Sequence, residues 1–291
     1  MTACTERHTA ERAYGLVGEG QKGMPSRLSV TTALDLAVAD EYLDALAPIT
    51  LDELVERAGL LTRMDRKYLL PAADLPAVLA GLPGDVCVLD IDRQRRFTYR
   101  SAYFDTPGLD SYLAAARRRR RRFKLRIRSY VDSDLHFLEV KTRGPRGTTV
   151  KQRFPYAGDG ARLGPESQHL AVETLAAAGV RADGFRFDLA LTTHYERTTL
   201  FIPSSGSRVT VDQRLAWTLP GGRTLAAPDS VIVETKSIRA TSAVDRLLWS
   251  LAHRPCAMSK YATGLAALRP DLPANRWCPV LKRHFATTRE S

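Results

Sequence analysis

Residues 123–130, Phe123-Lys124-Leu125-Arg126-Ile127-Arg128-Ser129-Tyr130, alternate between apolar and charged side chains over most of their length. Consecutive side chains of a β-strand point to opposite faces, so this period of two predicts a strand with one cationic and one apolar face. The same alternation recurs in 136–143, which contains Glu139 and Lys141, and in 149–156, which contains Lys151 and Arg153. Turn-forming residues at 132–134 and 144–147 separate the three segments, which favours antiparallel pairing of neighbours.

The pattern extends over most of the chain. Eight segments are predicted to be strands: 61–70, 95–104, 123–130, 136–143, 149–156, 189–198, 208–217 and 230–237. Apolar residues at three- and four-residue spacing predict helices over 33–46, 72–81, 166–178, 242–253 and 258–268, and a capping box at Thr50 and Glu53 predicts a short helix ending near Gly59. The sequence therefore predicts the α+β class, with an eight-stranded antiparallel β-barrel covered by helices. We expect residues 1–30 to form a mobile tail and residues 31–291 to form a single domain.

Charges gather on one face of each predicted strand. Examples are Lys124, Arg126 and Arg128, and Glu234 with Lys236. For any single strand, a solvated face explains such a pattern. Eight strands in succession favour another interpretation, in which helices cover the apolar faces and a closed sheet turns its charges inward. Buried cations repel one another and lose hydration, so a lumen of this kind predicts a polyanionic ligand accompanied by a metal ion.

Composition narrows the classes of function. The chain has 43 Lys and Arg against 32 Asp and Glu, for a net charge of +11. Six of the cations form the run 117–122, which we interpret as a solvated loop in preference to a guide for a polyanion. No apolar stretch has the length of a membrane span, the N-terminus lacks a signal-peptide core, and the four Cys form no CxxC pair, so we expect a cytoplasmic protein. The phosphate-binding loop and the dinucleotide, hydrolase and zinc-protease motifs are absent from the sequence.

Nine short motifs occur in the order found in one known family. They are Arg63-Met-Asp-Arg-Lys67-Tyr68, Tyr103-Phe-Asp-Thr-Pro107, Lys124-Leu-Arg126-Ile-Arg128-Ser-Tyr130, Phe137-Leu-Glu139-Val-Lys141, Lys151-Gln-Arg153-Phe154, Tyr195-Glu-Arg197, Arg208-Val-Thr-Val-Asp212, Val233-Glu234-Thr-Lys236-Ser237 and Ser259-Lys260-Tyr261. Over about residues 60–268 the chain thereby resembles the VTC domain, the polyphosphate polymerase family within the triphosphate tunnel metalloenzyme (CYTH-like) superfamily.

The resemblance implies an enzyme, an ATP–polyphosphate phosphotransferase of the polyphosphate kinase type, which moves the γ-phosphate of ATP to a growing polyphosphate chain and releases ADP. It implies phosphate-binding residues at Lys67, Arg126, Arg128, Lys141, Lys151, Arg197, Arg208 and Lys260. It implies a Mn²⁺ or Mg²⁺ ligand at Glu234, with Glu139 as a second choice, and catalytic roles for Lys67, Arg126, Arg128 and Glu234. The wider superfamily carries E-x-E-x-K in its first strand, whereas this chain has Arg63-x-Asp65-x-Lys67. The lost carboxylate favours a polymerase over a triphosphatase.

Other interpretations stay open at this point. A triphosphatase acting on inorganic or nucleoside triphosphates would use the same tunnel, and a non-catalytic polyphosphate sensor would need the cations without Glu234. Nucleic-acid binding through 117–122 leaves the alternating strand charges unexplained, so we expect no nucleic-acid partner. Relatives linked to membranes use other domains for that purpose, so a membrane role would require a partner protein. Asp65 and Asp212 are expected to pair with arginines, and His194 to face away from the cationic side chains.

Overall fold

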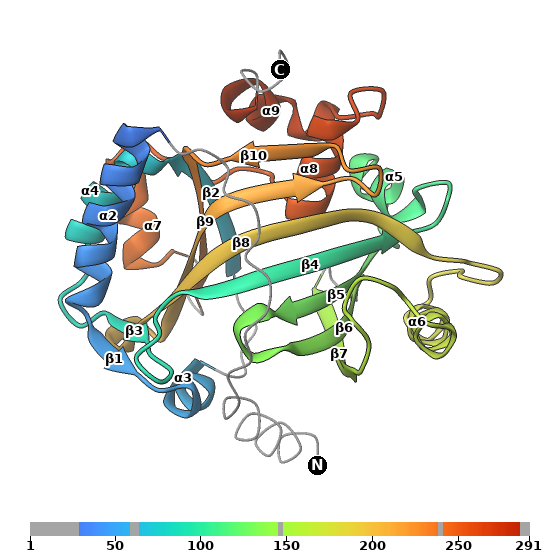
Figure 1. Ribbon diagram of the computed structural model, residues 1–291, viewed down its shortest axis with the longest axis horizontal. Helices are drawn as coiled ribbons and strands as arrows, with labels where there is room; N and C mark the ends of the chain where they lie inside the picture. Colours follow the sequence, from blue (N-terminus) through green and yellow to red (C-terminus); the bar gives the residue numbers. More distant parts are fainter. Residues whose placement is uncertain (1–28, 59–63, 145–147, 238–240, 286–291) are drawn as a thin grey trace. The chain divides into compact units, whose positions relative to one another are not determined.

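The computed structural model describes residues 29–58, 64–144, 148–237 and 241–285. These residues group into two compact units, one built around 98–193 and the other around the described parts of 29–97, 194–218 and 223–285. Residues 1–28 of the predicted tail and Arg63 lie outside the described residues, and Ser29 caps the first described helix. Figure 1 gives the course of the chain.

The first unit is an antiparallel sheet with helices. Its elements are β4 (Phe97–Asp105), α5 (Asp110–Ala116), β5 (Phe123–Tyr130), β6 (Leu135–Arg143), β7 (Thr149–Tyr156), α6 (Pro165–Ala177) and the start of β8 (Asp188–Ile202). Strand β5 pairs with both β4 and β6, and β6 pairs with β7, antiparallel throughout. The carboxylate of Asp105 accepts hydrogen bonds from the backbone N–H groups of Thr106, Ser111 and Tyr112. Asp105 therefore fixes the start of α5.

One face of this sheet is apolar and covered. Leu125 and Ile127 from β5 and Leu138 and Val140 from β6 are buried against residues of α6 and the segment that follows it. Because side chains alternate along a strand, this packing turns the charged residues of the same strands to the opposite face.

The second unit is also a sheet with helices. Its elements are α2 (Val30–Asp44), β1 (Ala47–Ile49), α3 (Leu51–Ala58), β2 (Met64–Pro71), α4 (Leu75–Ala80), β3 (Cys87–Leu89), the rest of β8, β9 (Ser207–Thr218), β10 (Thr224–Ala227), β11 (Ser230–Ser237), α7 (Ala243–Ser250), α8 (Lys260–Leu268) and α9 (Cys278–His284). Strand β11 pairs antiparallel with β2 on one side and with β9 on the other. Helices α2, α4 and α7 lie together on the apolar side of these strands (Figure 1). Thr50 and Glu53 form the predicted capping box at the start of α3.

The α+β class, the antiparallel pairing and the helical cover agree with the prediction. The closed barrel is not seen among the described residues: pairing ends at β7 in the first unit and at β2 in the second, so each unit has an open sheet edge. The predicted boundaries of β5, β7 and β11 match the structure at both ends. Three short strands, β1, β3 and β10, and two short helices, α5 and α9, were not expected from the sequence.

Candidate phosphate- and metal-binding site

The charged face of the first unit is dominated by cations. Its charged residues are Lys124, Arg126 and Arg128 on β5, Glu139 and Lys141 on β6, and Lys151 and Arg153 on β7. Arg126, Glu139 and Arg153 are cross-strand neighbours, as are Lys124, Lys141 and Lys151. On the described strands β5, β6 and β7, six cations therefore share this face with one carboxylate.

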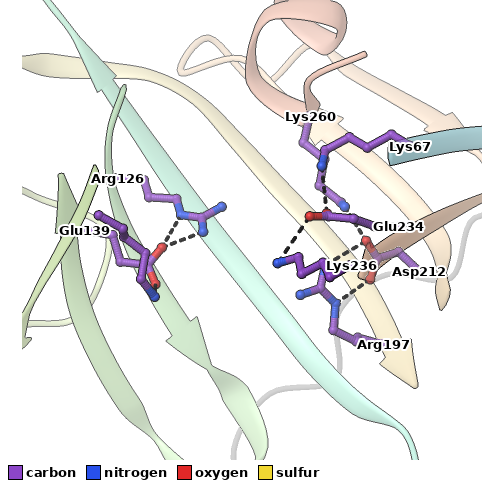
Figure 2. Close-up of polar contacts among 9 residues, drawn as sticks. Lys67, Arg126, Glu139, Arg197, Asp212, Glu234, Lys236 and Lys260 are labelled. Atoms are coloured by element: carbon purple, nitrogen blue, oxygen red, sulfur yellow. Dashed lines mark hydrogen bonds and ion pairs between the residues drawn. The ribbon is translucent and has the colours of Figure 1, made fainter. Parts of the chain in front are cut away.

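Glu139 is the anionic centre of this face and is 1% exposed. Its Oε2 accepts a hydrogen bond from Arg126 Nε at 2.7 Å and also contacts Arg126 Nη2, while its Oε1 lies 3.4 Å from Lys151 Nζ (Figure 2). Burial acts to raise the pKa of Glu139, but the positive charges of Arg126, Arg128 and Lys151 outweigh it and hold the pKa well below its usual range. Glu139 is therefore ionised at neutral pH.

The excess of cations on this face affects the pKa of Lys141. Repulsion from Arg126, followed by burial, lowers the pKa of Lys141 well below its usual range, against the opposing attraction of Glu139. A polyanion placed on this face would relieve that repulsion, because opposite charge favours the protonated amine.

The second unit places a carboxylate between two lysines. Glu234 Oε2 lies 2.9 Å from Lys67 Nζ, and Glu234 Oε1 lies 3.2 Å from Lys236 Nζ, as Figure 2 shows. The register pairs Glu234 with Lys67 on β2 and with Thr210 on β9. Burial acts to raise the pKa of Glu234, and Lys67, Lys236 and Arg197 together overcome it and hold the pKa well below its usual range. Burial also lowers the pKa of Lys236, with repulsion from Arg208 adding to it.

Asp212 joins three elements of the second unit. It is completely buried and accepts a two-pronged contact from Arg197 of β8, with Nε 2.5 Å from Oδ1 and Nη2 2.8 Å from Oδ2. Lys260 Nζ, from the first residue of α8, also contacts Oδ2 and lies 4.4 Å from the ring centroid of Tyr195. Burial acts to raise the pKa of Asp212, but Arg197 and Lys260 lower it to about 2. The predicted pairing of Asp212 with an arginine is confirmed.

A close approach holds α8 against the sheet. Trp217 Nε1 donates a hydrogen bond to the backbone oxygen of Lys260 at 2.9 Å. A Cβ added to Gly264, one turn further along α8, would lie 2.1 Å from Trp217 Cδ1. The indole and the glycine therefore fix the position of the helix that presents Lys260.

The predicted site residues divide between the two units. Arg126, Arg128, Lys141, Lys151 and Glu139 lie on the charged face of the first unit, and Lys67, Arg197, Arg208, Lys260 and Glu234 belong to the second. Their functional roles stay predictions. Three further residues belong to these faces: Lys124, Lys236 and Thr210. The alternation that identified their neighbours points to each of them, since each lies two residues from a predicted site residue.

The donor set at Glu234 fits a hard divalent cation. In the part of the chain that the structure describes, no group of three or more His, Cys, Asp or Glu side chains is placed to hold a metal. Mg²⁺ commonly uses only one or two protein carboxylates and takes its other ligands from water and substrate phosphates. Glu234 offers one carboxylate, and the hydroxyl of its neighbour Thr210 is buried without a hydrogen-bond partner among the described residues. The Glu234 side chain is 13% exposed, whereas that of Asp212 is completely buried between Arg197 and Lys260, so Asp212 does not fit as a ligand.

Two other expectations are confirmed. Residues 117–122 form an exposed loop between α5 and β5, in which Arg122 donates a hydrogen bond to the backbone oxygen of Arg119. His194 is exposed, while its neighbour Tyr195 is buried. Among the described helices, none combines the length and apolar character of a membrane span.

Comparison with known proteins places the chain in a family. The model of the VTC domain matches residues 62–176 and 186–269. The chain is similar to a putative adenylyl cyclase from Hippeastrum described as having a dominant triphosphatase activity, at 18% identity and a TM-score of 0.41, over 74% of this chain and 100% of that one. It is also similar to the PH1819 protein of Pyrococcus horikoshii OT3, at 12% identity and a TM-score of 0.36, over 65% and 89% of the two chains. No curated protein matches. Because the family model covers most of its length, the chain belongs to the VTC domain family.

Proposed function

We propose that the protein is a metal-dependent polyphosphate polymerase, which transfers the γ-phosphate of ATP to the end of a polyphosphate chain and releases ADP. The observation that carries the proposal is the state of the two candidate carboxylates: Glu139 is buried and Glu234 is partly buried, and each is ionised and held by two or more cations. Membership of the VTC domain family supports the same assignment.

The cations supply what phosphoryl transfer asks of a protein. The reaction needs mainly positioning of the phosphates and neutralisation of their charge. A charge-assisted contact from Lys or Arg to a phosphate contributes roughly 1.5–3 kcal/mol. The first unit offers six cations around Glu139, enough to bind several consecutive phosphates.

The state of the carboxylates favours phosphate over water as the acceptor. A general base that activates water works best with a pKa near the operating pH. The pKa values of Glu139 and Glu234 are instead shifted downwards, by cations that occupy their oxygens. A terminal phosphate oxygen is already anionic and needs no base. We therefore infer transfer between phosphates, with Lys67 beside Glu234 in the second unit, and Arg126 and Arg128 beside Glu139 in the first, as phosphate-binding residues.

Glu234 and Thr210 would hold the divalent cation. When bound, a Mg²⁺ or Mn²⁺ ion would neutralise part of the charge of the phosphates undergoing transfer. Lys67 and Lys236 remain on either side of Glu234 to contact phosphate oxygens.

The test is incubation of the protein with ATP and Mn²⁺, with ADP release followed in solution and polyphosphate followed on a gel. We expect polymer from the wild type and none from Glu234→Gln. Glu196→Gln is a matched control, because Glu196 pairs with the half-exposed Arg214 of β9 and lies off the proposed site. Orthophosphate without polymer would identify a triphosphatase, and polyphosphate binding without turnover would identify a sensor; either result refutes the proposal.

A further inference from the structure

The charged face of the first unit carries aromatic rings at one end. Tyr99 of β4 and Tyr130 of β5 are cross-strand partners with ring centroids 4.9 Å apart, and Phe137 of β6 meets Tyr130 edge-to-face at 5.9 Å. Tyr130 lies two residues beyond Arg128, and Phe137 is the cross-strand partner of Arg128, so all three rings share a face with the cations. None of them belongs to the apolar cluster that packs under α6.

The guanidinium groups of two arginines pack against these rings. The guanidinium carbon of Arg153 lies 3.5 Å from the centroid of Phe137 and 5.3 Å from that of Tyr130, and Arg153 is exposed. Arg128 lies over Tyr99 at 5.5 Å. Although Arg153 is the cross-strand partner of Glu139, its guanidinium lies over the ring of Phe137. Flat rings and guanidinium planes of this kind are the groups on which nucleobases stack. A phosphate chain without a base has no aromatic ring to stack on them.

The other end of the same face carries lysines. Lys124, Lys141 and Lys151 lie side by side across β5, β6 and β7. The six-arginine loop 117–122 leads directly into β5 at this end. Along β5 the distance from Tyr130 to Lys124 is six residues, roughly 20 Å. The face therefore runs from rings, through Arg126, Arg128 and Glu139, to groups that recognise only negative charge.

We propose that the cluster of Tyr99, Tyr130, Phe137 and Arg153 stacks the base of the nucleotide, so that the phosphates extend from it towards Lys124, Lys141 and Lys151. The inference rests on the proposed function for the identity of the nucleotide as a phosphate donor. Stacking uses the face of any purine, so this site predicts weak discrimination between ATP and GTP. It also gives the face a direction: the nucleoside lies at the ring end and the polymer at the lysine end.

The test compares two ligands that share phosphates and differ in the base. Affinities for the β,γ-imido analogue of ATP and for inorganic tripolyphosphate are measured by titration calorimetry with Mg²⁺ present, for the wild type, Arg153→Lys and Phe137→Leu. Arg153→Lys keeps the charge and removes the plane, and Phe137→Leu keeps an apolar side chain and removes the ring. We expect both variants to bind the nucleotide analogue about tenfold more weakly and tripolyphosphate within twofold of the wild type.

A matched control is Phe154→Leu, because Phe154 lies on β7 but packs against the apolar cluster on the other side of the sheet. Phe154→Leu should not weaken binding of the nucleotide analogue more than binding of tripolyphosphate. Unchanged nucleotide affinity in Arg153→Lys, or an equal loss for both ligands in Phe137→Leu, would overturn the inference. Binding is measured here without turnover. A wild-type protein that builds no polymer would therefore refute the polymerase activity without affecting the test of base stacking.

Discussion

Asp212 offers the sharpest test of how the second unit holds its cations. Asp212→Asn keeps the shape of the side chain and removes a charge that faces both Arg197 and Lys260 in a completely buried position. Two cations would then lie beside a neutral amide. Removing one partner of a buried ion pair typically costs 3–5 kcal/mol of folding stability, because the remaining charge stays buried and uncompensated.

The lowered pKa of Asp212 reflects the same two contacts. Burial acts to raise it, and Arg197 and Lys260 lower it from 3.8 to about 2. At about 1.4 kcal/mol per unit, this net shift corresponds to roughly 2 kcal/mol of stability. Since the folded-state pKa is lowered, this contribution is complete at pH values above about 4 and is lost as the pH falls through about 2. The stability difference between wild type and variant should therefore be constant between pH 5 and pH 8.

Thermal unfolding followed by tryptophan fluorescence measures the effect, because Trp217 is fully buried beside α8. A loss of about 3 kcal/mol lowers the melting temperature by roughly 6–12 °C in a protein of this size class. Lys260→Met in the Asp212→Asn background should recover part of the loss, since it removes one uncompensated charge. A melting temperature within 2 °C of the wild type, or no recovery in the double variant, would refute the role assigned to Asp212.

The remaining predictions concern packing, charge and the base. Gly264→Ala should destabilise the protein by about 1–3 kcal/mol, seen as a lower melting temperature, because the new methyl group meets the ring of Trp217; unchanged melting would contradict the close approach. Tripolyphosphate affinity should fall as the pH rises from 7 to 9, because Lys141 loses its proton at a lower pH than an ordinary lysine. The affinity of Lys141→Arg, measured by calorimetry, should depend less steeply on pH. An equally steep pH dependence in the wild type and the variant would contradict a phosphate-binding role for Lys141. Turnover with GTP should stay within about tenfold of turnover with ATP, and a larger difference would mean that the site reads the edges of the base.

Strand prediction succeeded where side chains alternate over eight or more residues. The segments of β5, β7 and β11 have one charged or polar face and one apolar face over most of their length, and their boundaries follow from the sequence. Strands β1 and β3 have three residues each, too few for a period of two to stand out. They pair with each other, a contact between distant segments that no local pattern reports.

Helix α5 was missed for a related reason. Its seven residues give little helical periodicity, and its start is fixed by the carboxylate of Asp105, which bonds to three backbone N–H groups. The place of Asp105 before Thr106-Pro107 is typical of a turn, but no local pattern marks the helix that begins there.

The composition of the charged faces followed from the sequence, whereas the pairing of charges did not. Alternation alone places Glu234 beside Lys236 and Arg208 beside Asp212 on common faces. Glu234 pairs with Lys67 because of the register between β2 and β11. Asp212 of β9 pairs with Lys260, 48 residues away, because of the position of α8. Register between distant strands is a property of the folded chain, so these partners became visible only in the structure.

The central claim is that the γ-phosphate moves to another phosphate and not to water. The most direct measurement is a single turnover with γ-labelled ATP, Mn²⁺ and a short polyphosphate acceptor, stopped in acid-free quench and separated by size. We expect most of the label to enter polyphosphate one phosphate longer than the acceptor, with ADP formed in equal amount. Label recovered as orthophosphate, with the acceptor unchanged, would contradict it.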